Sequence, residues 1–372
     1  MNYRNEFGLM RRKRGEKKYV WYYWTYDEDN RRIYRSTGQT SKAKALEYVM
    51  RRRDEGLLGE IDRRSITLND FTKDMFIEGK CPIEREANAR GRSVAGSTRQ
   101  NRRINLDKHV LPHLGKHAVS RLTAKQINEW LVNLPETDKL SRTSSNQCMD
   151  ALSKVMDHAV KMGIVRQNPC REVESLGNDS TSVAAFTFDE VKAVIGNMED
   201  WKNPLHRLMC ITASMTGMRI GEVLALQPCN VHEDRIDVRW NYSQTDGLRK
   251  TKGKYDRVVP ISGYLYGLLS EQFPVNPEGF IFSGNGDKPY TASTIAVAMR
   301  NRCEELGIEG KSFHSFRSFV DTQMLAQNIN ESIIRKMIGH KDAKMTEHYL
   351  HLEAGEFPAV RKFQDSVELV LA

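Results

Sequence analysis

Hydrophobic and polar residues follow one spacing near the start of the chain and a different spacing further on. Residues 19–26 are dense in β-forming aromatic and branched side chains, and residues 31–36 form a second such run after an acidic, turn-forming tetrapeptide. A basic tract at residues 10–14 precedes them as an arm, and residues 41–53 have a helical composition. Alternate residues of a strand face opposite sides, so the aromatics can form a core and the interleaved arginines a binding face. We predict a small β-sheet carrying one helix for residues 1–60.

Helical spacing dominates the second segment, residues 67–175, which follows a linker at residues 61–66. The sequence T-A-K-Q at 123–126 resembles a helix-capping box. Apolar residues then recur at intervals of three and four positions, as on one face of a helix: Ile127, Trp130, Leu131 and Leu134. A second stripe of this kind consists of Met149, Leu152, Met156 and Val160. The pattern predicts an all-α bundle.

A polar linker at residues 176–182 leads into a third segment, residues 183–372. Thr187–Glu190 resembles another capping box, and residues 205–215 are apolar and helical until a Thr-Gly pair interrupts them. Strand-like runs occur at 236–240, 257–261 and 280–282. We predict a mixed, mainly helical domain with a small antiparallel sheet, so the whole chain is expected to be a multidomain protein.

The net charge of +9 is distributed unevenly along the chain. Residues 1–60 contain 15 Lys and Arg against 9 Asp and Glu, and residues 85–108 contain 7 against 2. Clustered basic charge favours a polyanionic partner such as DNA, although a solubilising or solvated surface explains charge alone equally well. The arginines that we consider DNA-binding candidates are Arg11, Arg12, Arg14, Arg31, Arg99, Arg102 and Arg103.

The six cysteines are scattered along the chain and form no C-x-x-C pair. This spacing is typical neither of a zinc site nor of a disulfide framework, so we expect no metal and a reducing, cytosolic location. No apolar run reaches membrane-spanning length, and no apolar signal core follows the basic N-terminus.

Six polar residues in the third segment are suited to chemistry on a negatively charged oxygen. Two arginines, two histidines and a lysine can bind or protonate such an oxygen, and a tyrosine is a potential nucleophile. This inventory suits phosphoryl transfer on a DNA backbone without a metal or another cofactor. The six are Arg219, Lys252, His314, Arg317, His340 and Tyr349.

The spacing of these residues strengthens the hypothesis only when it is taken as a whole. His314 and Arg317 are three residues apart, so on a helix they share one face and can bracket a phosphate. Arg219 follows a glycine break, and Glu222 can orient it through an ion pair. Each signal also has an ordinary explanation: H-x-x-R arises often by chance, Arg219 and Glu222 can form a plain surface salt bridge, and a lone Tyr349 is usually structural.

Together these motifs resemble those of the tyrosine recombinases, specifically integrases of phage or transposon type. The matching motifs are T-G-x-R-x-G-E at 216–222, a hairpin lysine at 252, H-x-x-R at 314–317, G-H at 339–340 and T-x-x-Y-x-H at 346–351. The resemblance extends from about residue 67 to the end, which implies a core-site DNA-binding domain at 67–175 and a catalytic domain at 183–372. Residues 1–60 look like an arm-binding domain. Lys250 and Lys254 remain alternatives to Lys252.

The resemblance implies a role for each site residue. Tyr349 attacks the scissile phosphate and forms a 3′-phosphotyrosyl link, while Lys252 is the general acid for the leaving 5′-oxygen. Arg219 and Arg317 hold the non-bridging oxygens. His314 and His340 donate hydrogen bonds or help to move the tyrosine proton, and which of them does which stays open. Glu222 buttresses the site.

The resemblance also implies the partners and the setting. The DNA partners are core and arm attachment sites of a mobile element, recombined by a homotetramer through a Holliday junction. A DNA-bending protein and an excisionase are expected accessory factors, in the cytoplasm of a bacterial host and close to its nucleoid. The segment after residue 349 is apolar enough to pack on a neighbouring protomer or on its own domain. Alternative hypotheses are a type IB topoisomerase and a non-catalytic DNA-binding regulator on the same scaffold.

Overall fold

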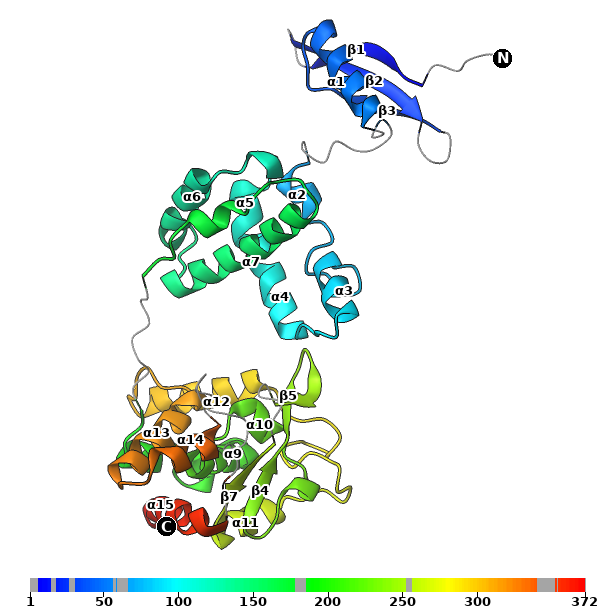
Figure 1. Cartoon of the computed structure of the whole chain (residues 1–372). Coiled ribbons are helices and arrows are strands. Elements are labelled where there is room, and N and C mark those ends of the chain that lie inside the picture. Colours follow the sequence, from blue (N-terminus) through cyan, green and yellow to red (C-terminus); the bar gives the residue numbers. More distant parts are fainter. Residues whose placement is uncertain are drawn as a thin grey trace. The chain divides into compact units, whose positions relative to one another are not determined.

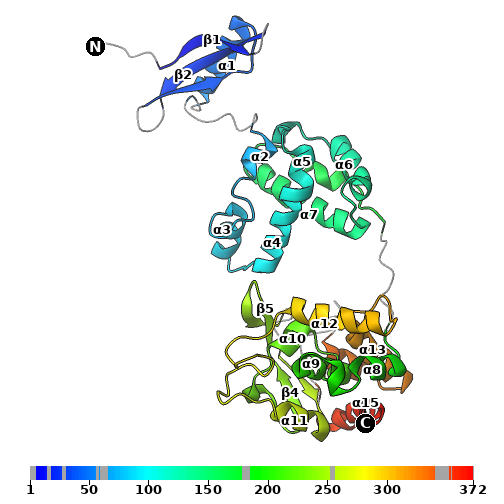
Figure 2. The ribbon, with the colours of Figure 1, turned by 180° about the vertical axis from the view of Figure 1, so that it is seen from behind.

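The computed structural model describes residues 6–14, 18–26, 31–55, 58, 66–177, 185–251, 256–339, 352 and 354–371, without the side chains of Arg14 and Lys18. Contacts divide the chain into two compact units, residues 1–94 with 99–179 and residues 95–98 with 180–372. The elements form a small sheet with one helix, a helical bundle and a mixed domain (Figure 1; Figure 2). Within the described residues, no helix is long and apolar enough to cross a membrane.

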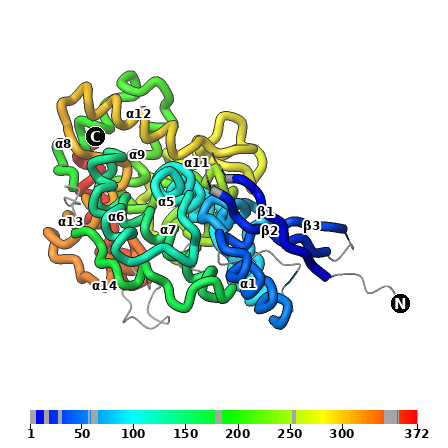
Figure 3. The backbone as a smooth tube through the Cα atoms, turned by 90° about the horizontal axis from the view of Figure 1, so that it is seen from above, coloured from blue at the N-terminus to red at the C-terminus, as the bar shows by residue number. Residues whose placement is uncertain are grey.

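The N-terminal sheet contains three antiparallel strands in the order β1-β2-β3. They are β1 (Gly8–Arg14), β2 (Lys18–Tyr26) and β3 (Arg32–Ser36), and α1 (Lys42–Asp54) follows. The helix lies against the sheet (Figure 3), where Ala45 and Val49 are fully buried. The expected sheet with one helix is confirmed, while the acidic turn at 27–30 lies outside the described residues.

The expectation that residues 10–14 form a separate basic arm is wrong. These residues belong to β1, which pairs with β2 continuously from Gly8 opposite Trp24 to Arg14 opposite Lys18. The tract is therefore a strand at the edge of the sheet, and Arg11, Arg12 and Lys13 alternate between its two faces. The run of basic residues suggested an arm, and charge alone gives no information on whether a backbone pairs with a neighbouring strand.

The helical bundle agrees with the predicted apolar stripes. Thr123 and Gln126 form the expected capping box, and Ile127, Leu131 and Leu134 are fully buried on the helix that follows. The helices are α2 (Leu68–Phe71), α3 (Pro82–Ala89), α4 (Gly96–Asn105), α5 (Leu111–Leu114), α6 (Ala124–Thr137) and α7 (Arg142–Lys161), with a π-helical turn at Leu106–Val110 and 3-10 turns at Val119–Arg121 and Pro169–Glu172.

The mixed domain is built around α9 (Pro204–Thr216), a helix whose residues 208–216 are all buried. Other helices pack on it from several sides, and α13 makes the most extensive contact. The other helices described in this domain are α8 (Phe188–Ile195), α10 (Ile220–Leu224), α11 (Gly263–Ser270), α12 (Ala292–Glu305), α13 (Phe313–Ala326), α14 (Glu331–Ile338) and α15 (Phe357–Leu371), with 3-10 turns at Met198–Asp200, Pro228–Asn230 and Ala354–Glu356. The predicted capping box at Thr187 begins α8.

Four short strands form two antiparallel pairs in this domain. They are β4 (Arg235–Val238), which pairs with β7 (Arg257–Pro260), and β5 (Trp240–Ser243), which pairs with β6 (Gly247–Lys250). The prediction of a strand at 280–282 is wrong, although the structure describes these residues. Ile281 and Phe282 are buried, but their backbone groups bond to Leu226 and Tyr290 in loops, so their apolar character reflects core packing without a strand ladder.

The C-terminal helix α15 packs on its own chain, against α8, α9 and β7. Val360, Phe363 and Val367 are fully buried. The side-chain amide of Gln364 donates to the carbonyl oxygens of Met215 (3.1 Å) and Pro260 (2.8 Å). Of the two arrangements considered for this segment, the structure has the one in which it covers its own domain.

Candidate active site

The structure describes half of the six predicted site residues. Arg219, His314 and Arg317 lie among the described residues, as does Glu222, whereas Lys252, His340 and Tyr349 lie outside them. The alternative lysine Lys250 is exposed at the end of β6, and Lys254 lies outside the described residues. The site that follows is therefore built from the arginines and their partners.

A glycine turn at the end of α9 positions Arg317. Gly217 has a left-handed backbone (φ 64°), and a Cβ atom added to it would lie 2.7 Å from Cγ2 of Ile338. Any side chain would therefore both strain the turn and clash with α14. This turn presents the Gly217 carbonyl to Arg317, whose Nη1 donates to it at 2.9 Å.

Arg317 is held in the core, and one of its guanidinium nitrogens has no partner within the part of the chain that the structure describes. Phe313, Phe316 and Phe319 are buried and anchor α13, and the Arg317 residue itself is only 3% exposed. Its buried Nη2 has no hydrogen-bond partner among the described residues. Buried polar atoms in proteins nearly always have a partner, so this nitrogen is a ready donor for an oxygen of a bound anion.

Arg219 lies at the start of α10 and is fixed by two neighbours. Its Nη1 donates to Glu222 Oε1 (3.0 Å) and its backbone N–H donates to Glu222 Oε2 (2.9 Å). Its Nη2 donates to the carbonyl oxygen of Gly339, just after α14 (3.2 Å). The predicted ion pair is present, but Glu222 is buried, with a side chain only 2% exposed, which excludes the plain surface salt bridge.

Sequence reasoning missed Arg257, which is the main partner of Glu222. Its Nη1 and Nη2 donate to the two carboxylate oxygens of Glu222 at 2.9 and 2.7 Å, and its Nε donates to the carbonyl oxygen of Met337 at 2.9 Å. The signal was present: Arg257 lies two residues before the buried Val259, on the same face of β7, and an arginine on the buried face of a strand needs a carboxylate.

The arginines set the protonation of Glu222. Burial raises the pKa of its carboxyl group, but the charge and hydrogen bonds of Arg257, followed by those of Arg219, outweigh burial and lower this pKa to about 2. Burial, and then the charges of Arg219 and Arg257, lower the pKa of Arg317 to about 9. Arg317 therefore remains protonated at neutral pH. Three arginines against one glutamate give this cluster a charge of +2 (3 − 1).

His314 precedes Arg317 by one turn of α13 and belongs to the exposed surface of the helix. Partial burial, and then the charges of Arg317 and Arg219, lower the pKa of its imidazole below the ordinary 6.5. The ring is therefore mainly neutral at pH 7, with one N–H donor and one acceptor nitrogen. It can donate a hydrogen bond or accept a proton, in agreement with both roles left open for it.

We expect replacement of Glu222 by glutamine to reduce stability in a pH-dependent way. The folded-state pKa of about 2 lies below the ordinary carboxyl value of 4.5. The ionised carboxylate thus stabilises the fold fully above pH 4.5, by about 3 kcal/mol, and this contribution is lost as the pH falls from 4.5 towards 2. Hydrogen exchange of peptides from α9 and α10 in urea measures the free energy of unfolding of each protein. The difference between wild type and E222Q should shrink between about pH 7 and about pH 3, and a constant difference contradicts the ion-pair explanation.

The three DNA-binding candidates on α4 (Arg99, Arg102 and Arg103) are largely engaged within the bundle. Arg99 pairs with Glu78 (2.9 Å) and Glu84 (3.4 Å). Arg103 pairs with Asp107 (2.7 Å) and also donates to two backbone carbonyls, and Arg102 lies over the ring of Phe76. These side chains stabilise the bundle, so charge spacing alone overstated their availability to a ligand.

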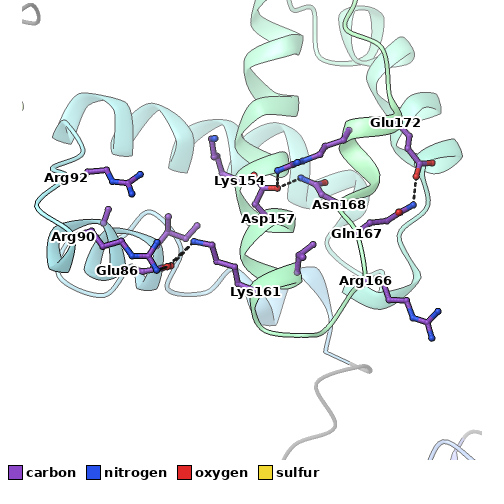
Figure 4. A pocket seen from close by; sticks show the side chains of 14 residues that line it. Glu86, Arg90, Arg92, Lys154, Asp157, Lys161, Arg166, Gln167, Asn168 and Glu172 are labelled. Carbon is purple, nitrogen blue, oxygen red and sulfur yellow. Dashed lines mark hydrogen bonds and ion pairs between the residues drawn. The ribbon is translucent and has the colours of Figure 1, made fainter.

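A different surface of the bundle offers basic residues that are unpaired within the described part of the chain: a groove of about 730 Å³ along α7. Its charged lining residues are Glu86, Arg90, Arg92, Lys154, Asp157, Lys161, Arg166, Arg171 and Glu172. Arg90 and Lys161 pair with Glu86, and Arg171 pairs with Asp157. Arg92, Lys154 and Arg166 have no such partner among the described residues. Figure 4 shows Arg92 on the α3 side, Lys154 on α7 and Arg166 on the opposite side.

The N-terminal sheet has one face covered by α1 and one face rich in arginine and aromatic side chains. Tyr23 is buried on the covered side, so Tyr22 and Trp24 face the other way. There the guanidinium of Arg12 lies 5.1 Å from the ring centroids of both Tyr22 and Tyr34, and that of Arg32 lies 3.8 Å from Trp24. Arg11 lies on the opposite face of the sheet, where its guanidinium is 4.0 Å from the ring centroid of Tyr19, and Arg31 precedes β3.

Among the described residues, no cluster of three or more histidine, cysteine, aspartate or glutamate side chains is arranged to hold a metal ion.

Comparison with known proteins places the mixed domain in a family. Residues 184–356 match the phage integrase family. The ICEBs1 integrase of Bacillus subtilis (strain 168) is 27% identical over 273 residues, which cover 68% of this chain and 73% of that protein. A tyrosine recombinase of Thermosipho africanus (strain TCF52B) is 24% identical over 263 residues, covering 68% and 89%.

Solved structures have the same fold. The Tn1549 transposon integrase in complex with circular intermediate DNA superposes with a TM-score of 0.59 at 17% identity, covering 79% of this chain and 99% of that one. A lambda integrase tetramer bound to a Holliday junction gives a TM-score of 0.60 at 16% identity, covering 93% and 98%. With its family match at residues 184–356, the mixed domain described above belongs to the phage integrase family, the tyrosine recombinases.

Proposed function

We propose that this chain is a site-specific DNA recombinase that cuts and rejoins DNA through a phosphotyrosyl intermediate. The observation that supports it best is the arginine pair in the family-matching domain. Arg219 and Arg317 are each oriented by a glycine carbonyl at a helix end, and the buried Nη2 of Arg317 is unpaired among the described residues. A cluster with a charge of +2 and a fixed, unpaired donor is suited to a phosphodiester.

The two arginines bind the non-bridging oxygens of the scissile phosphate. Their donors are fixed before the reaction, so they stabilise the charge that grows on these oxygens at no further cost of reorganisation. The half-exposed Arg219 guanidinium (43%) meets the DNA from the surface, while Arg317 meets it from the core. His314, neutral at pH 7, is suited either to donate a hydrogen bond to the same phosphate or to accept the tyrosine proton.

The remaining steps use the three residues outside the described ranges. The Tyr349 oxygen forms a bond to phosphorus as the bond to the 5′-oxygen breaks, and Lys252 gives its proton to that leaving oxygen. The phenol proton passes to a base, for which His340 and His314 are the candidates. A 5′-hydroxyl of the partner strand then attacks the phosphotyrosine, which restores the tyrosine and joins the strands without ATP.

Two surfaces outside the mixed domain are proposed to bind other parts of the DNA. The arginine and aromatic face of the N-terminal sheet, residues 12, 22, 24, 32 and 34, has the size and charge to lie in a groove of an arm-type site. The basic groove on α7 offers three cations, unpaired among the described residues, to backbone phosphates near the core site. Phosphate contacts of this kind position the protein without specifying sequence.

The assembly is proposed by similarity to the lambda integrase tetramer on a Holliday junction. Four copies of this chain act on two duplexes in the bacterial cytoplasm, assisted by a DNA-bending protein and, for excision, an excisionase. We also propose that the arm-binding domain ends at residue 60, that the core-binding domain spans residues 67–175, and that the catalytic domain begins at residue 183.

A plasmid assay separates this function from that of a type IB topoisomerase. A supercoiled plasmid carrying both ends of the native element is incubated with the protein and the accessory bending protein, and a plasmid without these ends is the control. We expect recombinant circles only from the first plasmid. Relaxation of both plasmids without recombinants favours the topoisomerase, and tight binding without any cleavage favours a DNA-binding regulator.

Neutralising the groove on α7 should weaken DNA binding and make it less sensitive to salt. Each cation that contacts a phosphate contributes about 0.9 to the slope of log affinity against log salt. The triple variant R92A/K154A/R166A should therefore lose up to about 3 from this slope, measured with an attachment-site duplex. A control with three exposed lysines of the same bundle replaced (K73A/K80A/K125A) should keep the wild-type slope. Equal slopes for all three proteins contradict the role of the groove.

A further inference from the structure

The carboxylate of Glu222 lies between two guanidinium groups. Oε1 accepts from Arg219 Nη1 (3.0 Å) and Arg257 Nη1 (2.9 Å), and Oε2 accepts from the Arg219 backbone (2.9 Å) and Arg257 Nη2 (2.7 Å). Arg257 thus forms a two-pronged pair with this carboxylate, while Arg219 shares only one of its oxygens through the side chain. Such a planar pair is the strongest geometry available to arginine.

The charge balance around Glu222 shows why Arg257 is needed in addition to Arg219. If Arg219 were the sole cation beside Glu222, the pair would be neutral and the Arg219 guanidinium would be drawn towards the buried carboxylate. With Arg257 present, Glu222 is already neutralised, and Arg219 keeps a positive charge for another anion. An ion pair that is buried on both sides, as in Glu222 (2%) and Arg257 (7%), is weakly screened by water, so this difference is retained.

Arg257 also fixes the chain segment that ends α14. Its Nε donates to Met337 at 2.9 Å, and a Cβ atom placed on Gly339 would lie 3.3–3.4 Å from three of its side-chain atoms. The carbonyl of that same Gly339 accepts from Arg219 Nη2 at 3.2 Å. Arg257 thereby joins the start of α10, the strand β7 and the end of α14, three segments that are distant in sequence.

We propose that Arg257 is a positioning residue for DNA strand cleavage: it neutralises Glu222 and holds the end of α14, so that Arg219 keeps its positive charge for the scissile phosphate and stays aimed at it. This inference rests on the proposed recombinase function. Arg257 does not touch the phosphate, and its effect reaches the reaction through Arg219.

Single-turnover cleavage tests this role with full-length protein and a nicked duplex that traps the covalent product. At saturating protein, R257M should cleave about 10²-fold more slowly than wild type, with a dissociation constant for DNA within about threefold. Adding E222Q to R257M removes the carboxylate that would otherwise neutralise Arg219, and should restore the rate at least about tenfold over R257M. R257K keeps the charge without the fork, and should fall between R257M and wild type.

The control is R302M, which removes another arginine–carboxylate pair of the same domain (Arg302 with Asp200, 3.0 Å) and should cleave at the wild-type rate. A folded R257M that cleaves as fast as R302M overturns the inference, and so does a double variant no faster than R257M. If R257M fails to fold, R257K decides the test: a wild-type rate overturns the proposal and a loss of about tenfold supports it. Absence of covalent product from the wild type itself would instead contradict the proposed function.

Discussion

Replacing Tyr349 with phenylalanine abolishes strand cleavage and leaves DNA affinity unchanged. The substitution removes only the hydroxyl oxygen that forms the bond to phosphorus, and the ring remains to fill its space. Without this nucleophile no covalent intermediate can form. Gel shift with an attachment-site duplex measures the affinity, and a denaturing gel of the nicked duplex measures the covalent product.

A matched control for this variant is Tyr264→Phe, because Tyr264 belongs to the same domain, on α11, and is partly exposed (39%). It should give wild-type amounts of covalent product. Any covalent product from Y349F would show that a different residue attacks the DNA, and a parallel loss of DNA affinity would show that Tyr349 is needed for binding.

Replacing Arg317 with lysine slows cleavage by about 10²–10³-fold, the usual effect of losing one fixed donor to a developing oxyanion. Arg317 uses Nη1 for the Gly217 carbonyl, and its second nitrogen, unpaired among the described residues, is left for the phosphate. A lysine ammonium is a single point of charge and cannot occupy both positions of the planar fork. Single-turnover cleavage at saturating protein measures this loss.

The control for R317K is Arg207→Lys, at an arginine on α9 that donates to the backbone carbonyls of Ile195 and Gly196 away from the site. Both variants keep their charge and lose a fork, but only R317K should lose catalysis. A rate for R317K within about threefold of R207K would mean that charge alone suffices and that the fork has no role at the phosphate.

Capping boxes and helical spacing of apolar residues predicted several helices correctly from the sequence. The Thr123 and Thr187 capping boxes both begin helices, and the apolar spacing after Thr123 identified residues that are buried. These features depend on contacts three or four residues apart. The family motifs led to Arg219, His314 and Arg317 as site residues, because each motif fixes residue type and order together, and their catalytic roles stay a prediction.

Contacts between distant residues could not be predicted in the same way. The pair between Glu222 and Arg257 spans 35 residues and the bond from Arg257 to Met337 spans 80, and no spacing rule connects such positions. The same limit explains the errors at 10–14, where pairing with β2 decides the structure, and at 280–282, where loops satisfy the backbone. For Arg99 the partner carboxylates Glu78 and Glu84 come from outside its helix.

Mapping the covalent link on the protein tests the central claim most directly. Wild-type protein is trapped on the nicked duplex in the presence of a chelator, digested with nuclease and trypsin, and analysed by mass spectrometry. The tryptic peptide 345–361 contains a single tyrosine, Tyr349. We expect this peptide to carry the nucleotide through a phosphotyrosyl bond. A nucleotide on any other residue, or no covalent product from protein that binds the duplex, would contradict the assignment of this chain as a recombinase acting through Tyr349.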